Sequence, residues 1–179
     1  MALTKSGELE ALLFASGSPL PLDKLAEALQ LSQEETGTLL EELQLACRDE
    51  SRGLTLRKAA GGWQLVTKPE AIEVIRSLQE QQELRLSSAA METLTIIAFK
   101  QPVTKAEVEA IRGVKIDGVL GTLTDLQLIA EVGRKEVLGR PILYGTTDKF
   151  LTTFGLDTLA DLPELPEELL DLDEAKSEE

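Results

Sequence analysis

The side chains best placed to do chemistry are Arg112 and the three cations of the predicted second hairpin. They are Arg112, Arg134, Lys135 and Arg140. Guanidinium and ammonium groups bind phosphates and carboxylates through charge-assisted hydrogen bonds. The cluster therefore suits three roles: contact with DNA phosphates, docking of an acidic segment of a partner or of this chain's own tail, or balance of nearby carboxylates on a solvated hairpin. The residues alone leave these three roles open.

Residues suited to catalysis or metal binding are scarce. The chain contains no histidine, and Cys47 is its only cysteine. Imidazole is the commonest general base near neutral pH, and imidazole and thiolate groups are the usual zinc ligands, so this composition argues against catalysis by a general base and against a zinc site. A single cysteine also excludes an internal disulfide. A cysteine at an inward helical position is more typical of packing than of reactivity. We therefore expect no enzyme, no cofactor and no metal site.

The charge of the chain is strongly negative and unevenly distributed. Its net charge is −14, from 32 acidic and 18 basic residues. Residues 155–179 hold ten carboxylates and one lysine, which gives this segment a net charge of −9. Such a balance opposes tight, general binding to nucleic acid, which needs cations to displace counterions from phosphates. The chain also lacks a signal-peptide pattern and a membrane-spanning apolar run, so we expect a cytoplasmic protein.

The first 81 residues have the pattern of three helices followed by a β-hairpin. Apolar side chains at helical spacing predict helices that begin near residues 7, 21 and 32. Ser32 and Glu35 have the spacing of a capping box. Two alternating runs follow, with Gly61-Gly62 between them, and they predict a hairpin that turns at these glycines. A last helix is predicted to open at Pro69.

The same pattern recurs when the chain is shifted by 83 residues without a gap. Thr104 and Glu107 then form a second capping-box pattern. The repeat predicts a second module of the same fold over residues 88–155. The shift pairs apolar residues at core-type positions of all three helices: Leu13 with Ile96, Leu25 with Val108, Leu40 with Leu123, Leu43 with Leu126 and Leu45 with Leu128.

The second module is predicted to end in a hairpin and a short helix. The hairpin strands cover residues 132–137 and 142–144 and are joined through Leu138-Gly139-Arg140-Pro141. The closing helix begins at Thr146 or Thr147 as N-cap and ends at Gly155. Its Phe150 and Phe154 lie one turn apart, and we expect both to be buried.

We therefore predict an α+β, mainly helical chain built from two tandem winged-helix domains. The first domain covers residues 1–81 and the second covers residues 88–155. A connector of residues 82–87 joins them, and an acidic, flexible tail of residues 156–179 follows. These two domains are called the first and second module below.

The third helix of each module does not look like a reader of DNA. Residues 32–50 carry six acids and one arginine, and residues 115–131 carry three acids and one lysine. Neither offers an Asn or Arg face for base edges. The alternative function is a winged-helix transcription regulator that contacts DNA through the basic second hairpin. In favour of a protein partner, Leu45 lies roughly opposite the inward stripe of its helix, where it could be an exposed apolar contact.

Several longer stretches resemble one known family. They are Gly139-Arg140-Pro141-Ile142-Leu143-Tyr144-Gly145-Thr146-Thr147, then Phe150-Leu151 and Phe154-Gly155-Leu156, together with residues 9–15, Gly62-Trp63, and Ile111-Arg112-Gly113-Val114 with Asp117. Over residues 6–166 the chain resembles segregation and condensation protein B, ScpB, a non-SMC subunit of bacterial condensin. The run that begins with Gly139-Arg140-Pro141 is the most specific of these matches.

The resemblance implies a non-catalytic adaptor in chromosome condensation and segregation. Members of the family have two winged-helix domains and form homodimers, largely through the first. They bind the kleisin ScpA and reach the SMC ATPase through it, so DNA would be held only indirectly, at the nucleoid. We expect the partner contact around the second hairpin, although turn geometry and core packing are alternative reasons for some of these residues. The candidates are Arg112, Arg134, Gly139, Arg140, Pro141 and Tyr144.

Overall fold

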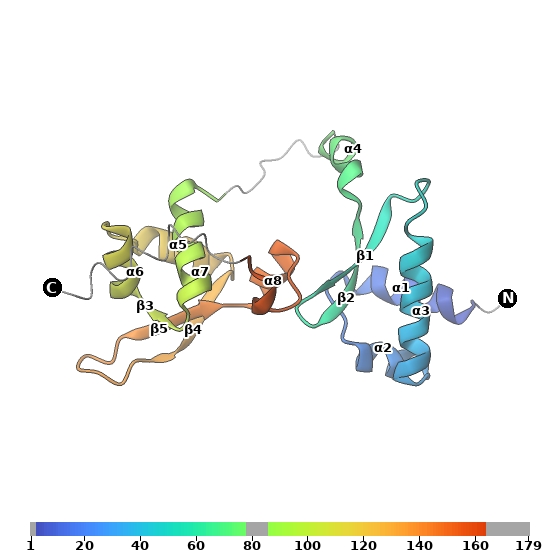
Figure 1. The fold of residues 1–179 in the computed structure, drawn as a ribbon, viewed down its shortest axis with the longest axis horizontal. Helices are drawn as coiled ribbons and strands as arrows, with labels where there is room; N and C mark the ends of the chain where they lie inside the picture. The colour runs from blue at the N-terminus through green and yellow to red at the C-terminus, as the bar shows by residue number, and fades with distance from the viewer. Residues whose placement is uncertain (1–2, 78–85, 164–179) are drawn as a thin grey trace.

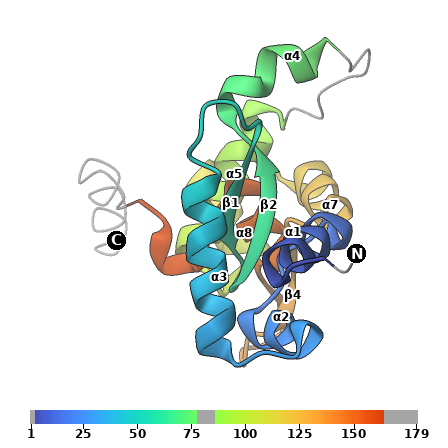
Figure 2. The same cartoon turned by 90° about the vertical axis from the view of Figure 1, so that its right-hand side faces the viewer.

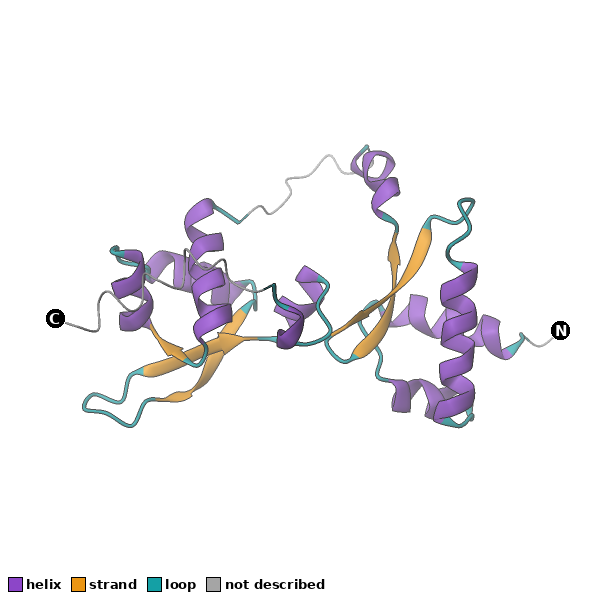
Figure 3. Cartoon of the chain, in the orientation of Figure 1, coloured by secondary structure: helices purple, strands orange, loops and turns teal. Residues whose placement is uncertain are grey.

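The protein is described by a computed structural model that places residues 3–77 and 86–163. Its fold is mixed α and β, mainly helical, with two small antiparallel sheets. The helices and strands form two bodies, which follow one another along the chain, each with its own sheet and core (Figures 1 and 3). The coarse prediction of a helical α and β chain with small sheets is therefore confirmed.

The first module contains three helices and a hairpin in the expected order. Thr4 caps the first helix by accepting a hydrogen bond from the Gly7 amide, and Gly17 ends that helix in the left-handed region. Ser32 and Glu35 form the predicted capping box. The elements are α1 (Lys5–Ser16), α2 (Leu22–Leu29), α3 (Gln33–Ala46), β1 (Leu54–Ala59), β2 (Gly62–Thr67), η1 (Pro69–Ala71) and α4 (Ile72–Arg76).

The turn of the first hairpin lies one residue earlier than predicted. Ala60 and Gly61 are its two positive-φ residues, whereas Gly62 is the first residue of β2. Glycine is needed at position 62 for close packing and not for a positive φ, because a Cβ there would come within 2.9 Å of the Leu20 backbone. Leu20 forms an isolated bridge with Trp63, and each amide donates to the other carbonyl at 2.8 Å. The bridge fastens the α1–α2 connection to the sheet.

The second module repeats this architecture. The bounds of α6 are those of α2 shifted by 83 residues, and Thr104 and Glu107 form the second capping box. The sheet order is β3-β5-β4, with both pairs antiparallel. The elements are α5 (Ser88–Lys100), β3 (Val103–Thr104), α6 (Lys105–Arg112), α7 (Asp117–Asp125), β4 (Ile129–Arg134), β5 (Ile142–Thr146), α8 (Asp148–Phe154) and η2 (Leu159–Asp161).

Two of the residue pairs in the gapless repeat are not equivalent in the structure. Leu13 is buried, at 1% exposed, but its predicted counterpart Ile96 is only half-buried. The fully buried residue of α5 at this level is its neighbour Ile97, at 0% exposed. Leu45 is 64% exposed, whereas Leu128 is 5% exposed. The second difference arises because α7 ends at Asp125 and the chain then turns through Gln127, at φ 58°, whereas α3 continues to Ala46.

The end of the second module also differs from the prediction. Strand β4 begins at Ile129, three residues before the predicted start, and its first residue is 1% exposed. Helix α8 has the predicted N-cap at Thr147 and ends at Gly155, which is left-handed. Phe150 is buried at 4% exposed, but Phe154 is 42% exposed, so the prediction that both are buried is wrong for Phe154.

The predicted connector and tail are only partly within the described residues. Ser87 is the N-cap of α5, and Leu86 packs against the second core, whereas connector residues 82–85 lie outside the described part. The tail was predicted to start at residue 156, but Leu156 and Leu162 also pack against the second core. Residues 164–179 lie outside the described residues, and the disorder predicted for them stays a prediction.

The tip of the first hairpin contacts the segment that follows α8. The Ala60 amide donates to the Leu156 carbonyl at 3.0 Å, and the Gly61 amide donates to the Asp157 carboxylate at 2.9 Å and to its carbonyl at 3.2 Å. Lys58 Nζ lies 3.2 Å from the same carboxylate. Figure 1 shows α8 between the β1–β2 hairpin and the second sheet. We call this set of contacts, Lys58–Gly61 with Leu156–Asp157, the inter-module clasp.

Candidate partner-binding surfaces

Helix α3 turns a carboxylate-rich face outward. It runs along the outside of the first module (Figure 2). Its exposed residues include Glu34, Glu35, Glu41 and Glu42, because the inward positions are taken by Thr36, Leu40 and Leu43. The Ser32 hydroxyl, and then the Ser32 amide, donate to the Glu35 carboxylate, which lowers the pKa of Glu35. This face repels phosphates and attracts cations.

The second hairpin presents two arginines at an open loop. Arg134 Nη1 donates to the Arg140 carbonyl at 3.2 Å, and Arg140 Nη2 lies 3.4 Å from the Glu136 carboxylate. Gly139 and Arg140 both have positive φ, at 85° and 40°, which sets the loop shape. Leu138 at the tip is fully exposed. The loop therefore combines exposed guanidinium groups with an exposed apolar side chain.

Lys135 ties this hairpin to α6. Its ammonium group bonds the Glu107 carboxylate, which also accepts from the Thr104 amide at 2.7 Å as part of the capping box. The Lys135 hydrogen bond, followed by those from Thr104, lowers the pKa of Glu107 from 4.5 to about 2. The ion pair and the helix cap therefore share the Glu107 carboxylate. Lys135 thus already has an ionic partner within the module.

Arg112 lies apart from the hairpin arginines and faces α5. Its Nη1 donates to the Ala89 carbonyl at 2.7 Å and to Thr93 Oγ1 at 2.6 Å, and its Nη2 lies 3.0 Å from Glu92. Only 13% of its side chain is exposed. Arg112 therefore joins the end of α6 to α5, and any contact with a partner stays a prediction.

The last two candidates of the second hairpin lie in or next to β5. Pro141 is half-buried and immediately precedes the strand, and its carbonyl accepts from the Lys135 amide at 2.9 Å. Tyr144 pairs with Val103 on one side and with Glu131 on the other, and it packs partly against the second core. Arg134, Gly139, Arg140 and Pro141 are thus brought together at the loop, while Tyr144 lies in the middle strand of the sheet.

Leu45 and Phe14, on different helices, are among the large apolar side chains that the first module exposes. Leu45 on α3 is 64% exposed, which agrees with its predicted position opposite the inward stripe. Phe14 on α1 is 76% exposed and was not singled out in the sequence. The signal was present, because Leu9 and Leu13 take the inward positions of α1 and leave Phe14 to one side. Ala11 and Leu12, on the same helix, line a shallow hollow of about 400 Å³ with Leu3, Ala15, Ala28 and Leu29.

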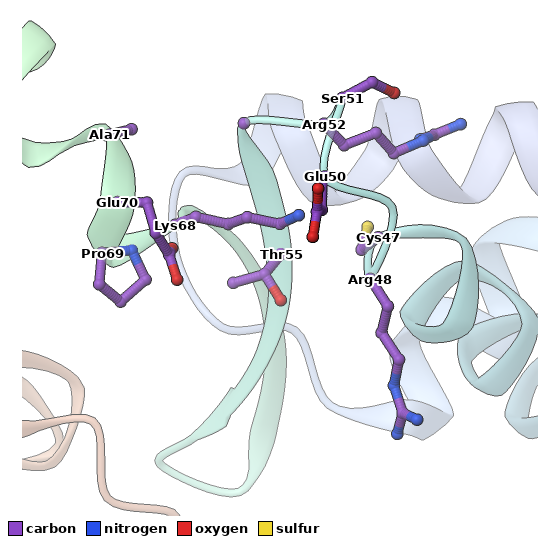
Figure 4. Close-up of a pocket in the computed structure, with 11 residues that line it drawn as sticks. Cys47, Arg48, Glu50, Ser51, Arg52, Thr55, Lys68, Pro69, Glu70 and Ala71 are labelled. Carbon is purple, nitrogen blue, oxygen red and sulfur yellow. The ribbon is translucent and has the colours of Figure 1, made fainter.

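A larger hollow, of about 780 Å³, lies beside the end of α3 (Figure 4). It is bordered by Cys47, Arg52, Thr55, Lys68 and the η1 residues, among others. Two of its cations have partners within the chain, because Lys68 Nζ donates to the Asp49 carbonyl at 2.7 Å and Arg52 lies 3.7 Å from Glu10. Cys47 itself is 2% exposed and belongs to the first core.

Residues 3–77 and 86–163 contain neither a metal-binding cluster nor a membrane-spanning helix. No group of three or more acidic or cysteine side chains in these ranges is arranged to hold a metal ion. No helix in them combines the length and the apolar character needed to cross a bilayer.

The fold and its surfaces define a protein made of two small helix-and-hairpin modules with exposed charged and apolar surfaces. An acidic helix face and an apolar α1 face lie on the first module, and a cationic loop lies on the second. The chain belongs to the family described as segregation and condensation complex subunit ScpB, which matches residues 7–165.

Individual relatives agree with this family. The chain is 52% identical over 157 residues to segregation and condensation protein B of Moorella thermoacetica. The aligned region covers 88% of this chain and 80% of the relative. The chain is 52% identical over 161 residues to the protein of the same name from Geobacillus kaustophilus, which covers 89% and 74% respectively. A solved structure described as a dimer of the ScpB N-terminal domain complexed with an ScpA peptide is 39% identical, covers 41% of this chain and 93% of its own, and has a TM-score of 0.41.

Proposed function

We propose that this chain is a non-catalytic adaptor subunit of the bacterial SMC–kleisin condensin complex. In this role it forms a homodimer, binds the kleisin ScpA, and reaches the SMC ATPase only through the kleisin. Both modules are winged-helix domains in this proposal, with β1–β2 and β4–β5 as their wings. The observation that carries the proposal is the family match, which extends over residues 7–165 and includes both modules. The site of action is the nucleoid in the cytoplasm.

The charge of the surfaces favours a protein partner over direct DNA binding. In DNA-binding winged helices the third helix lies in the major groove. Here the corresponding helix α3 exposes Glu34, Glu35, Glu41 and Glu42, which would face phosphates. Counterion release cannot offset this repulsion, because it requires cations on the protein. DNA therefore associates with the assembled complex and not with this subunit alone.

The outer surface of α1 is our proposed dimer face. Phe14 is 76% exposed there, and Ala11 and Ala15 beside it are small and exposed. Small residues next to a large aromatic one allow two copies of a helix to approach closely and to insert their rings. Burying about 150 Å² of apolar surface at each Phe14 would contribute roughly 3–4 kcal/mol per copy as an upper limit.

The kleisin contact is proposed at the loop of the second hairpin. Arg134 and Arg140 offer exposed guanidinium groups, and Leu138 offers an apolar anchor beside them. An acidic and apolar segment of the kleisin would complement this combination. Gly139 and Pro141 shape the loop, whereas Tyr144 and Arg112 support the module behind it.

Two paired measurements test the proposal. Sedimentation of Phe14→Asp should show a weaker dimer than the unchanged chain, whereas Leu45→Asp, at a similarly exposed residue of α3, should leave the dimer intact. Calorimetry with purified ScpA should show binding that Arg140→Glu weakens and that Arg48→Glu, with the same charge change on the first module, does not. No ScpA binding at micromolar concentration, or tight binding of duplex DNA by this chain alone at physiological salt, would contradict the proposed function.

A further inference from the structure

An apolar groove lies on the second module between α5 and α8. Its volume is about 350 Å³. Leu94, Ala98 and Phe150 are its buried residues, and Met91 and Phe154 are 41% and 42% exposed. The full lining consists of Met91, Leu94, Thr95, Ala98, Phe99, Phe150, Phe154, Leu156, Leu162 and Pro163. Apolar side chains thus meet water in a concave surface, which favours an occupant.

The position of Phe154 shows why this groove is open. Its ring lies against Phe150, with centroids 4.8 Å apart and planes tilted by 43°. The two residues are one helical turn apart in α8. Phe150 reaches the core, but no element among the described residues covers Phe154 from the outside, so its outer face remains in the groove.

The chain itself already runs along this surface. After α8 it turns at Gly155, and Leu156 and Leu162 pack against the second core. Between them, η2 is closed by the Asp161 carboxylate, which accepts from the Thr158 amide at 2.8 Å. Pro163, the last described residue, lines the groove, and 16 further residues follow it. The next part of the chain therefore leaves from the groove's own border.

We propose that the groove is the docking site of residues 164–172 of the same chain. This segment continues the alternation of leucines and acids, with Leu165, Leu169 and Leu172 at spacings of four and three residues. That spacing places the three leucines on one side of a helical turn and leaves the carboxylates towards water. The docked segment extends the contact that Leu156 and Leu162 begin.

The geometry favours this occupant over a separate protein. Leu165 is two residues beyond Pro163, and two residues span at most about 7 Å of extended chain. A segment tethered this closely has an effective concentration in the millimolar range, which exceeds that of a free partner. The carboxylates do not have to enter the apolar groove, because the leucines alone fill it.

Met91 provides a direct probe of the occupied groove. The chain contains only two methionines, Met1 and Met91, so their methyl resonances are readily distinguished by NMR. We expect the Met91 methyl signal to shift when the full chain is compared with a chain that ends at Pro163. Leu169→Asp in the full chain should reproduce most of that shift. Leu170→Asp, which lies on the other side of the turn, is the matched control and should not.

The alternatives give different results. Identical Met91 signals in the full and shortened chains would overturn the proposal, as would equal effects of Leu169→Asp and Leu170→Asp. A shift that disappears on dilution would show that the segment comes from a second copy, and it would overturn docking within one chain. The amide spectrum of α6, which lies outside the groove, should remain unchanged in all variants and thereby report that the second module is folded. None of these results depends on whether ScpA binds.

Discussion

The inter-module clasp depends on the carboxylate of Asp157, and its removal has a calculable effect. In Asp157→Ala the Gly61 amide loses the charged acceptor at 2.9 Å, and Lys58 loses its partner at 3.2 Å. A hydrogen bond to a charged group contributes about 1.5–3 kcal/mol. The lower end applies here, because the Gly61 amide keeps the Asp157 carbonyl at 3.2 Å. The Lys58 pair is partly exposed and adds at most about 0.5 kcal/mol.

A total of about 1.5–2 kcal/mol corresponds to an increase of roughly 10- to 30-fold in the population with an open clasp. The Ala60 amide is a clean reporter, because it donates to the Leu156 carbonyl at 3.0 Å and the substitution does not touch it. Hydrogen exchange at this amide should therefore become about 10- to 30-fold faster in Asp157→Ala, in line with the same free energy.

A matched variant separates this effect from a general loss of stability. Asp148 is an exposed aspartate in the first turn of α8, and it makes no contact with the clasp. Asp148→Ala should leave exchange at Ala60 close to that of the unchanged chain. An unchanged exchange rate in Asp157→Ala, or equal acceleration in both variants, would refute the contribution to the clasp that is assigned to this carboxylate.

Three further predictions concern the modules themselves. In Lys135→Ala, the pKa of Glu107 should rise from about 2 towards 4.5, as measured by NMR titration of its carboxyl carbon. Since the folded-state pKa is the lower one, the stability that this carboxylate contributes is present above pH 4.5 and is lost as the pH falls towards 2. Leu40→Ala should lower the free energy of unfolding by about 3 kcal/mol in urea titrations, whereas Leu45→Ala should change it by less than about 0.5 kcal/mol when the chain is monomeric. Gly62→Ala should broaden or shift the amide signals of the first hairpin, because a methyl group has no room against the neighbouring backbone.

The signals that predicted the fold correctly are local in the chain. The capping boxes at Ser32 and Thr104 involve residues three positions apart, and both formed as expected. The helix that ends at Gly155 is of the same kind, because a left-handed residue is needed where the chain turns. Such features depend on a few neighbouring residues, so the order and spacing of residues in a short stretch are sufficient to recognise them.

Other predictions failed where a residue's environment comes from elsewhere in the chain. Gly62 has the sequence of a turn residue, but contact with Leu20 makes it a strand residue instead. Phe154 has the spacing of a buried residue, but α8 has no cover on that side among the described residues. The position of a residue along a helix determines which way its side chain points. Whether the side chain is buried there depends on the elements that pack against that side of the helix.

The sequence by itself determined the family, the two modules, most helix starts and the acidic character of α3, whereas the third helices end at Ala46 and Asp125, earlier than the predicted 50 and 131. Only the tertiary structure placed Arg112 against α5, left Phe14 exposed, and joined Gly61 to Asp157, which is 96 residues away. The physical reason is that helix caps and periodicity arise from interactions within a few residues. Ion pairs, grooves and clasps arise instead where distant segments meet, and no short pattern records which segments those are.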